Sequence, residues 1–574
     1  MRKPKDKAMT IRPWVKSYPP NVRWNAPLDL APVQSVLEKA AERFGSKPAL
    51  EFMNKRLSYA ELETLANRAA AGFQKLGVRP GVHVGLYLPN TPHYVIAFFG
   101  ILKAGGVVVN YSPLDALSTL QSKIDDSETD ILVTLDLASL YPQAEKLLAS
   151  TRLKSLVISE LAEMTPTAEP VKAQMKAAGM LAEVARDDRH VAFRHLIDND
   201  GEHQVHPLAA LDDALAVIQY TGGTTGSPKG AMLSHANLTA ACSLYAEVAT
   251  HSEDFLRVGE ERFICVLPLF HIYSLTVVML LGFRLGAELV LHPRFDPAAA
   301  LKDIVEKKIT VYMGVPTMHV ALLSVPSVET LDFSSLRYCS SGGAPLPVAV
   351  QERFESVIGC RLTEGWGMTE TAPLGTFTPK RGPRKPGSCG VPYPGTEMKF
   401  VDVANPEREV RFGERGEICV KGPNVTKGYW RTADPSAMTA DGYFRTGDVG
   451  YMDEDGFVYI VDRTKDMLLC GGFNVYPRNV EEAIYQHPSV EEASVIGIPD
   501  AYRGETPKAF VKLRAGAAPL TLDEMKAFLK DRLGKHEMIG AMEIRADLPK
   551  TPVGKISKKD LRDYAARGRA GREA

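Results

Sequence analysis

Residues 220–230 read Tyr-Thr-Gly-Gly-Thr-Thr-Gly-Ser-Pro-Lys-Gly and largely decide how the surrounding chain folds. An apolar run at 214–220 leads into this stretch and predicts a buried strand. The residues at 230–234, Gly-Ala-Met-Leu-Ser, predict a second strand after it. Between the two, glycines and hydroxyl side chains expose backbone N–H groups that can wrap a polyphosphate. The pattern therefore predicts a strand–loop–strand phosphate site.

This loop differs from the usual P-loop, which requires Gly-Lys-Ser/Thr at the start of a helix. Here Pro228 occupies the second glycine position of that pattern, and strand-like residues follow. A plain glycine-rich hairpin is the alternative interpretation. We favour the phosphate site because the hydroxyl residues and Lys229 are too regularly placed for a mere turn.

Composition and charge limit the class of protein. The chain has 574 residues, 45% of them hydrophobic and 24% charged, with a formal net charge of −1. At roughly 150 residues per domain this length allows two to four domains, and the balanced charge gives no field that would recruit nucleic acid. The seven cysteines are scattered without a Cys-x-x-Cys pair, which disfavours zinc sites and a disulfide framework and fits a reducing cytoplasm.

Membrane insertion is not indicated by the sequence. The basic N-terminus lacks a following apolar stretch and is no signal peptide. Lys103 interrupts the apolar stretch at 94–110, while Arg284 and Glu288 interrupt the one at 272–291. A cytoplasmic location is expected, and peripheral attachment to the inner face of the membrane and homodimer formation both stay open.

Strand-like and helix-like segments alternate along most of the chain. Helical spacing at 57–76 and 93–104 alternates with strand patterns at 82–88 and 106–110. Such alternation predicts an α/β fold with mixed or parallel sheets. The polar segment at 160–210 is interpreted as an insertion or surface loop with a helix near 170–186, and the Gly/Pro-rich segment at 371–396 predicts loops and short strands.

The pattern shifts near 463–475. Beyond it we expect a helix at 479–486, strands at 493–498 and 508–513, and a helix at 521–533. About 110 residues suit one small α+β domain. The expected organisation is therefore a large domain at 1–463, with mixed sheets and a β-rich portion, and a small domain at 466–574. The basic tail at 555–572 is interpreted as a solvated charge run, helical near its start.

Four further motifs carry small-residue turns, a flat ring, carboxylates and a lysine. They are Gly342-Gly343-Ala344-Pro345, Glu364-Gly365-Trp366-Gly367-Met368-Thr369-Glu370, Tyr443-Phe444-Arg445-Thr446-Gly447-Asp448 and Leu548-Pro549-Lys550-Thr551-Pro552-Val553-Gly554-Lys555.

Together and in this order, these motifs resemble the adenylate-forming superfamily of acyl-CoA synthetases, luciferases and nonribosomal peptide adenylation domains. The resemblance covers about residues 30 to 565 and is nearest to the bacterial long-chain fatty-acyl-CoA synthetase type. It rests also on three shorter segments: Leu269-Phe270-His271, Val461-Asp462-Arg463-Thr464-Lys465-Asp466-Met467 and Gly472-Phe473-Asn474-Val475-Tyr476-Pro477.

The resemblance implies a two-step reaction between a large domain and a mobile C-terminal cap. A carboxylate attacks the α-phosphate of ATP to give acyl-AMP and pyrophosphate. The cap then rotates about a hinge at Lys465, and the thiol of coenzyme A displaces AMP. Gly471 and Gly472 would lie on the loop that lines the pantetheine channel.

The resemblance also implies a role for each site residue. Lys555 would bridge carboxylate and phosphate, and His271 would gate the acyl site toward the thiol channel. Glu370 would bind Mg²⁺ with help from Thr221. Nucleotide binding would involve Thr221, Gly222, Gly223, Thr224, Thr225, Gly226, Lys229, Gly343, Ala344, Glu364, Gly365, Trp366, Thr369, Asp448 and Arg463. Within that set, Trp366 would stack on adenine and Asp448 would accept both ribose hydroxyls.

Each role has a plainer alternative. Lys555 could be a surface lysine, Glu370 a salt-bridged helix-start residue, and Trp366 or His271 part of a core. Two departures from the fatty-acyl signature, Tyr443 and the Ile539-Gly540 pair, leave medium-chain, dicarboxylic and aromatic acids open as substrates. A different acyl acceptor and a non-catalytic binding protein are the competing functions.

The acyl pocket is expected around Tyr245, residues 271–281, residues 315–317 and Gly342. These segments are mostly apolar. No cation for a distal carboxylate is obvious among them, although Arg284 is near in sequence.

Overall fold

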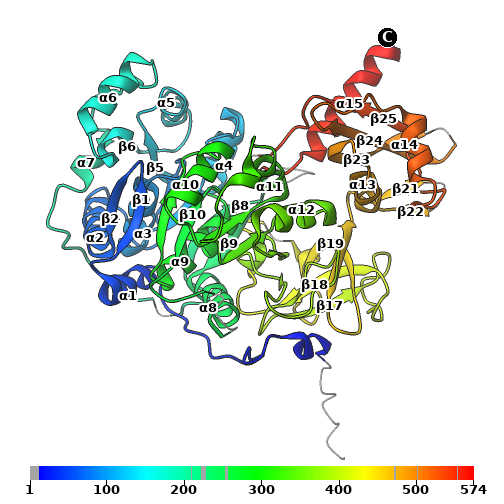
Figure 1. Ribbon diagram of the computed structural model, residues 1–574. Coiled ribbons are helices and arrows are strands. Elements are labelled where there is room, and N and C mark those ends of the chain that lie inside the picture. Colours follow the sequence, from blue (N-terminus) through cyan, green and yellow to red (C-terminus); the bar gives the residue numbers. More distant parts are fainter. Residues whose placement is uncertain are drawn as a thin grey trace, which may run out of the picture.

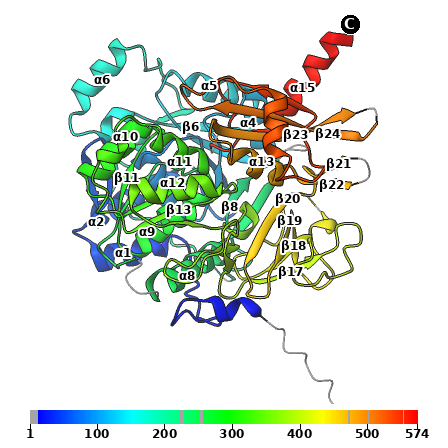
Figure 2. The ribbon, with the colours of Figure 1, turned by 45° about the vertical axis from the view of Figure 1, so that its right-hand side comes forward.

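The computed structural model describes residues 12–208, 210–221, 228–251, 256–432, 434–470, 473–500, 502–551 and 554–573. The chain forms a large body and a smaller C-terminal lobe, drawn in orange and red in Figure 1. In both views that lobe lies above the yellow sheet that ends the large body (Figures 1 and 2). The architecture is α/β, with mixed sheets in the large body, as the alternating pattern predicts.

Two seven-stranded sheets organise the described part of the large body. The first has the order β14-β13-β12-β10-β11-β1-β2 and is parallel except at the β1–β2 hairpin. Its strands are β1 (Pro48–Phe52), β2 (Lys55–Ser58), β10 (Arg262–Cys265), β11 (Glu288–Leu291), β12 (Val311–Gly314), β13 (Tyr338–Ser341) and β14 (Leu362–Glu364).

The second sheet has the order β7-β6-β5-β3-β4-β8-β9 and is parallel except at its last pair. Its strands are β3 (His83–Leu86), β4 (Val107–Asn110), β5 (Thr129–Leu135), β6 (Ser155–Ser159), β7 (His190–Ala192), β8 (Leu215–Tyr220) and β9 (Gly230–Ser234). The antiparallel β8–β9 pair confirms the two strands predicted on either side of the glycine-rich loop.

A pair of helices fills the space between the two sheets. Helix α2 contacts β1 and β2, helix α3 contacts β3 and β4, and the two helices contact each other. Every residue of α3 is buried, as expected for a helix covered on both sides. Ser58 and Glu61 form a capping box that fixes the start of α2.

The helices of the large body have the following bounds: α1 (Ser35–Phe44), α2 (Tyr59–Lys75), α3 (Pro92–Lys103), α4 (Leu117–Asp126), α5 (Tyr141–Ser150), α6 (Ala168–Ala177), α7 (Phe193–Leu196), α8 (His235–His251), α9 (Leu281–Arg284), α10 (Pro297–Glu306), α11 (Pro316–Leu323) and α12 (Val348–Ile358). A π-helix at Ser274–Leu280 precedes α9.

The β-rich end of the large body contains a two-stranded and a four-stranded antiparallel sheet. The first pairs β15 (Thr376–Phe377) with β16 (Val391–Pro392). The second has the order β17 (Glu397–Val401), β18 (Gly416–Lys421), β19 (Phe444–Met452) and β20 (Val458–Arg463).

The C-terminal lobe has its own hydrophobic core, which includes Val480, Val495 and Met525. Its sheet contains β21 (Leu468–Cys470), β22 (Phe473–Val475), β23 (Val490–Asp500), β24 (Gly504–Leu513) and β25 (Ala541–Ile544). Its helices are α13 (Pro477–Tyr485), α14 (Leu522–Leu529) and α15 (Lys558–Glu573).

Two sequence-based interpretations are wrong in part. Within 160–210, strand β7 extends the second sheet beside β6, and α7 buries Phe193 and Leu196 in the core. The basic tail is not a solvated run at its start, because Leu561 is fully buried and the Nζ of Lys558 lies 3.0 Å from Glu481. Arg562 also pairs with Asp466.

All seven cysteines are buried free thiols. Burial raises the pKa of most of them, for example to about 12 for Cys242, Cys265 and Cys389. Cys360 is the exception, because its neighbour Cys339 lowers its pKa. It lies two residues before β14, at the amino end of that strand.

Candidate active site

Several of the predicted site residues that the structure describes lie where parallel strands β12, β13 and β14 end. The carboxyl ends of parallel strands meet at one edge of a sheet, which is where α/β proteins bind ligands. The turn after β13 contains Gly343, whose φ of +77° favours glycine. A Cβ at this position would lie 3.1 Å from Cε of Lys555 in the C-terminal lobe. The backbone thus approaches Lys555 closely, with Ala344 next in the turn.

Lys555 reaches this edge from a tight turn of the C-terminal lobe. The Thr317 hydroxyl donates to the Gly554 carbonyl across the two parts of the chain. Burial lowers the pKa of Lys555 from 10.5 to about 8; nearby Arg463 lowers it further, while Asp448 opposes the shift. Loss of solvation therefore disfavours the ammonium form, which makes the site suited to an anion that would restore it.

Asp448 is buried between two donors from different segments. Its Oδ1 lies 2.9 Å from Nε of Arg463, the last residue of β20. Its Oδ2 accepts a hydrogen bond of 2.7 Å from the indole N–H of Trp366. One side of the indole packs closely on Gly375, where a Cβ would lie 2.3 Å from the ring. Trp366 thus holds Asp448 in place, a contact that the sequence did not reveal.

Glu370 forms a second acidic position, in a short helix that contacts strand β9. It lies in a short 3₁₀-helix at Thr369–Thr371 and is buried. Its Oε1 accepts a 2.6 Å hydrogen bond from the Tyr429 hydroxyl, and burial raises its pKa. Nζ of Lys229 lies 5.0 Å from the Tyr429 ring centre and 2.9 Å from Asp434.

Thr221 lies at the start of the predicted phosphate loop. Its backbone N–H donates a 3.0 Å hydrogen bond to the Lys229 carbonyl, as in a closed hairpin. Gly222, Gly223, Thr224, Thr225 and Gly226 lie outside the described residues. Gly471 and Gly472, predicted to line the thiol channel, also lie outside them.

Glu364 ends strand β14 and faces the C-terminal lobe. Burial raises its pKa to about 7, an effect that the positive charge of Arg478 opposes. Its Oε1 accepts a 3.1 Å hydrogen bond from the Leu346 N–H. The next residue, Gly365, has no room for a side chain, because a Cβ would lie 2.9 Å from the Thr376 carbonyl oxygen.

His271 lies near Lys555, just before the π-helix. Burial and the charge of Lys555 lower the pKa of His271 to about 3. Its Nδ1 accepts a 3.3 Å hydrogen bond from the Tyr273 N–H. The ring is therefore neutral at ordinary pH, and its Nδ1 serves as the acceptor.

Lys465 is exposed and lies two residues after the end of β20. Asp466 beside it is buried and pairs with Arg562 of helix α15. The segment that joins the large body to the C-terminal lobe is therefore held on one side and open to solvent on the other.

Three residues of this region were missed in the sequence: Tyr429, Asp434 and Arg478. Each acts through a partner distant in sequence, so no local spacing could have revealed it. The best available sequence signal for a site residue in this region was the aromatic pair Tyr429-Trp430, which follows Gly428.

Within the described ranges, no group of three or more His, Cys, Asp or Glu side chains is arranged so that it could hold a metal ion. Among the residues that the structure places, no helix is long and apolar enough to cross a membrane.

Comparisons with known proteins agree with this arrangement. Residues 37–430 match the family model described as AMP-binding enzyme, and residues 479–555 match the AMP-binding enzyme C-terminal domain. The chain is 39% identical over 555 residues to a long-chain-fatty-acid–CoA ligase of Bacillus subtilis (strain 168), covering 96% of this chain and 97% of the relative. It is 36% identical over 511 residues to a feruloyl-CoA synthase of Amycolatopsis sp, covering 88% and 93%.

Among solved structures, the anthranilate CoA ligase AuaEII in complex with anthranoyl-AMP is similar, with a TM-score of 0.83 and 25% identity. The match covers 95% of this chain and 99% of that structure. From the family models and from this near-complete coverage of its relatives, the chain belongs to the AMP-binding enzyme family of adenylate-forming ligases.

Proposed function

We propose that this protein is an ATP-dependent fatty-acid–CoA ligase. It joins a carboxylic acid to AMP with release of pyrophosphate, and then transfers the acyl group to the thiol of coenzyme A with release of AMP. The observation that carries the proposal is the approach of Lys555 to the turn at Gly343, near the ion pair of Asp448 and Arg463. ATP and coenzyme A as substrates fit the family of the chain.

In the first step, negative charge grows on the α-phosphate and on its leaving oxygen. Catalysis of such a transfer depends mainly on positioning and on charge stabilisation. Lys555 would bridge the attacking carboxylate and the α-phosphate. Asp448 would accept the ribose hydroxyls, and Arg463, which pairs with Asp448, would contact ribose or phosphate. Lys229 would bind the outer phosphates.

Magnesium would be held by Glu370. Mg²⁺ is usually bound by one or two carboxylates together with substrate phosphates and water. The burial that raises the pKa of Glu370 would be offset by a cation beside it. When bound, the ion would neutralise part of the phosphate charge, and Thr221 would assist from the adjacent strand end.

In the second step, Lys555 would have to leave the acyl-AMP. Rotation of the C-terminal lobe about Lys465 would remove Lys555 and bring the loop at 471–472 to the same place. His271, neutral beside Lys555, would separate the acyl site from the thiol entrance.

A coenzyme A-dependent AMP release assay tests the proposal. Protein, ATP, Mg²⁺ and a series of carboxylic acids are incubated with and without coenzyme A, and AMP, pyrophosphate and acyl-CoA are measured. Formation of acyl-CoA and AMP in equal amounts is expected. Pyrophosphate without acyl-CoA would indicate another acceptor, and absence of both products would indicate a binding protein.

A further inference from the structure

Lys465 marks the boundary between the large body and the C-terminal lobe. Thr464 still belongs to the large body, because its N–H and its hydroxyl donate to the Gly447 carbonyl of β19 at 2.9 and 2.8 Å. Asp466 belongs to the lobe, because it pairs with Arg562 of α15. Lys465, between them, is exposed. Side-chain contacts between a residue before this position and one after it would therefore have to change if the lobe turned.

Helix α13 of the lobe lies beside β20 and takes its cap from the large body (Figure 2). Its own N-cap residue, Tyr476, makes no side-chain cap hydrogen bond. The N–H of Arg478, in the first turn of the helix, instead donates to Oδ2 of Asp462 at 3.1 Å. Asp462 therefore does the work of an N-cap side chain, and its negative charge suits the positive end of the helix.

Arg478 also bonds the lobe to β20 through its side chain. Its guanidinium donates to the carbonyl of Ile460 in that strand. β20 is at the edge of the four-stranded sheet, and an edge strand leaves backbone groups that need partners from elsewhere. Arg478 is 7% exposed, so this orientation of the lobe keeps it from solvent. Tyr476 adds an apolar contact, because it packs with Val449 and Val461 of the large body.

A lysine of the lobe completes the surroundings of Asp462. Nζ of Lys558 lies 3.0 Å from Glu481, which is also in the lobe. Burial raises the pKa of Asp462, and the positive charge of Lys558 opposes that shift. Asp462 thus receives both an N–H donor and a favourable charge from the lobe. A turn of the lobe that removed them would leave the carboxylate with less stabilisation.

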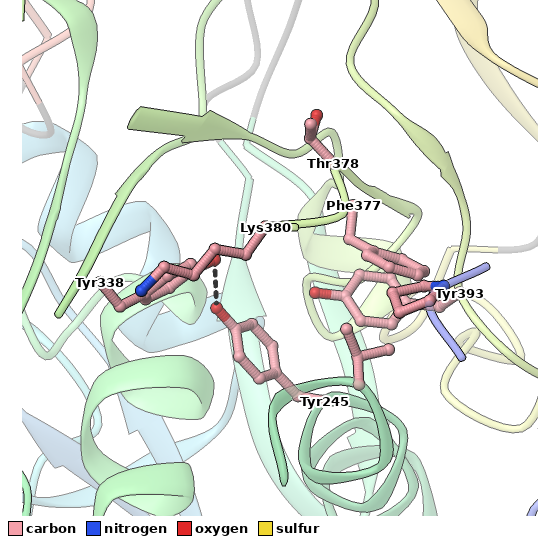
Figure 3. A pocket seen from close by; sticks show the side chains of 8 residues that line it. Tyr245, Tyr338, Phe377, Thr378, Lys380 and Tyr393 are labelled. Carbon is pink, nitrogen blue, oxygen red and sulfur yellow. Dashed lines mark hydrogen bonds between the residues drawn. The ribbon is translucent and has the colours of Figure 1, made fainter. Parts of the chain in front are cut away.

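Buried hydrogen bonds within the large body differ from these contacts. The Tyr245 hydroxyl of α8 donates to Tyr338 of β13 at 3.0 Å, and both partners would stay together whatever the orientation of the lobe (Figure 3). The bonds between Asp462, Arg478 and Ile460 join the two parts that the proposed reaction requires to move apart. In the structure they accompany the approach of Lys555 to the turn at Gly343.

We infer that Asp462 and Arg478 are positioning residues that hold the lobe in the orientation for acyl-AMP formation, and that their separation governs the passage to thioester formation. The inference rests on the proposed function. Because the first step uses the held orientation and the second step the released one, the ratio of the two rates follows the equilibrium between the orientations. Loss of a holding contact should therefore raise the second rate relative to the first.

The test measures acyl-AMP formation and, separately, acyl-CoA formation from supplied acyl-AMP. Arg478→Met keeps the backbone N–H and removes the guanidinium, so the ratio of the second rate to the first should rise about tenfold, as for loss of a charged hydrogen bond. Arg478→Lys keeps a charge and a donor and should recover part of the wild-type ratio. Asp462→Ala removes the cap and should raise the ratio about fivefold, whereas Asp462→Asn, which can still cap α13, should change it less.

Two contacts within the lobe supply matched controls. Arg532 donates to the Phe528 carbonyl at 2.6 Å, and Thr521 caps α14. Arg532→Met and Thr521→Ala therefore remove a similar bond and a similar cap without touching the large body, and both should leave the ratio of the two rates unchanged.

A second measurement does not depend on catalysis. Spin labels at Lys302→Cys in the large body and Asp523→Cys in the lobe, both exposed positions, report the distance between the two parts by pulsed electron paramagnetic resonance. Arg478→Met should increase the share of a second distance, and Arg532→Met should not. An unchanged rate ratio together with unchanged distances would overturn the inference, as would the same change in the controls. Failure of the proposed function would instead leave no acyl-AMP or acyl-CoA from any acid, while the distances still respond to Arg478→Met.

Discussion

Replacement of Lys555 by methionine separates the two half-reactions. The fall of its pKa from 10.5 to about 8 corresponds to about 3 kcal/mol of destabilisation of the ammonium form. An anionic ligand beside the ammonium group would offset part of this destabilisation. Loss of one preorganised donor to developing charge costs about 2.7–4 kcal/mol, or two to three orders of magnitude in rate. We therefore expect Lys555→Met to slow acyl-AMP formation by that factor.

The pH dependence of acyl-AMP formation gives a second test of the role of Lys555. The ammonium form is present below the pKa and is lost as pH rises through about 8. Because kcat/KM reports the pKa values of the free enzyme, the wild-type value for acyl-AMP formation should fall above pH 8. In Lys555→Met this alkaline decrease should be absent.

The assay measures pyrophosphate release for the first step and acyl-CoA formation from supplied acyl-AMP for the second. Lys559→Met, an exposed lysine of the same tail, is the control and should change neither step. Equal losses in both steps of Lys555→Met would refute the assignment. An alkaline decrease that survives in the variant would refute the pKa argument.

Lys465→Pro fixes φ near −65° at the expected hinge, so acyl-AMP should form and stay bound while acyl-CoA production collapses in a single-turnover assay; normal turnover would place the hinge elsewhere. Gly342→Leu would push on Tyr273, since even a Cβ at position 342 would lie 3.1 Å from the Tyr273 ring. The ratio of kcat/KM for a long acid to that for a medium acid should therefore fall. An equal loss for both acids would mean that Gly342 contacts the adenylate instead of the acyl chain. Asp448→Asn removes the charge that pairs with Arg463, and the KM for ATP should rise about tenfold, as for loss of a charged hydrogen bond; an unchanged KM would contradict ribose binding.

The strands of the large body could be predicted because parallel strands buried on both faces appear as continuous apolar runs. The predicted strands at 214–220 and 230–234 correspond to β8 and β9 within one residue. Strand β7 could not be predicted, because a three-residue strand at a sheet edge has no detectable period.

The tail shows the limit of reasoning from charge. Its lysines and arginines looked solvated, but Lys558 and Arg562 are paired with acidic residues far away in sequence. The same limit applies to the site. Motifs brought Lys555, Asp448 and Trp366 to attention, yet the bond between Trp366 and Asp448 depends on how two distant segments pack. The roles of the individual residues stay predictions.

The burial of the cysteines has a chemical consequence for an enzyme of this kind. An acyl-adenylate is an activated electrophile, and thiolates are strong nucleophiles. A protein thiolate beside it would be acylated and would consume the intermediate. All seven thiols are buried, and the one with a lowered pKa, Cys360, lies at the amino end of β14, whereas the turn at Gly343 that Lys555 approaches follows the carboxyl end of the neighbouring strand β13. Burial thus holds most of these thiols in the protonated, weakly nucleophilic form, so that the reactive sulfur would be that of coenzyme A.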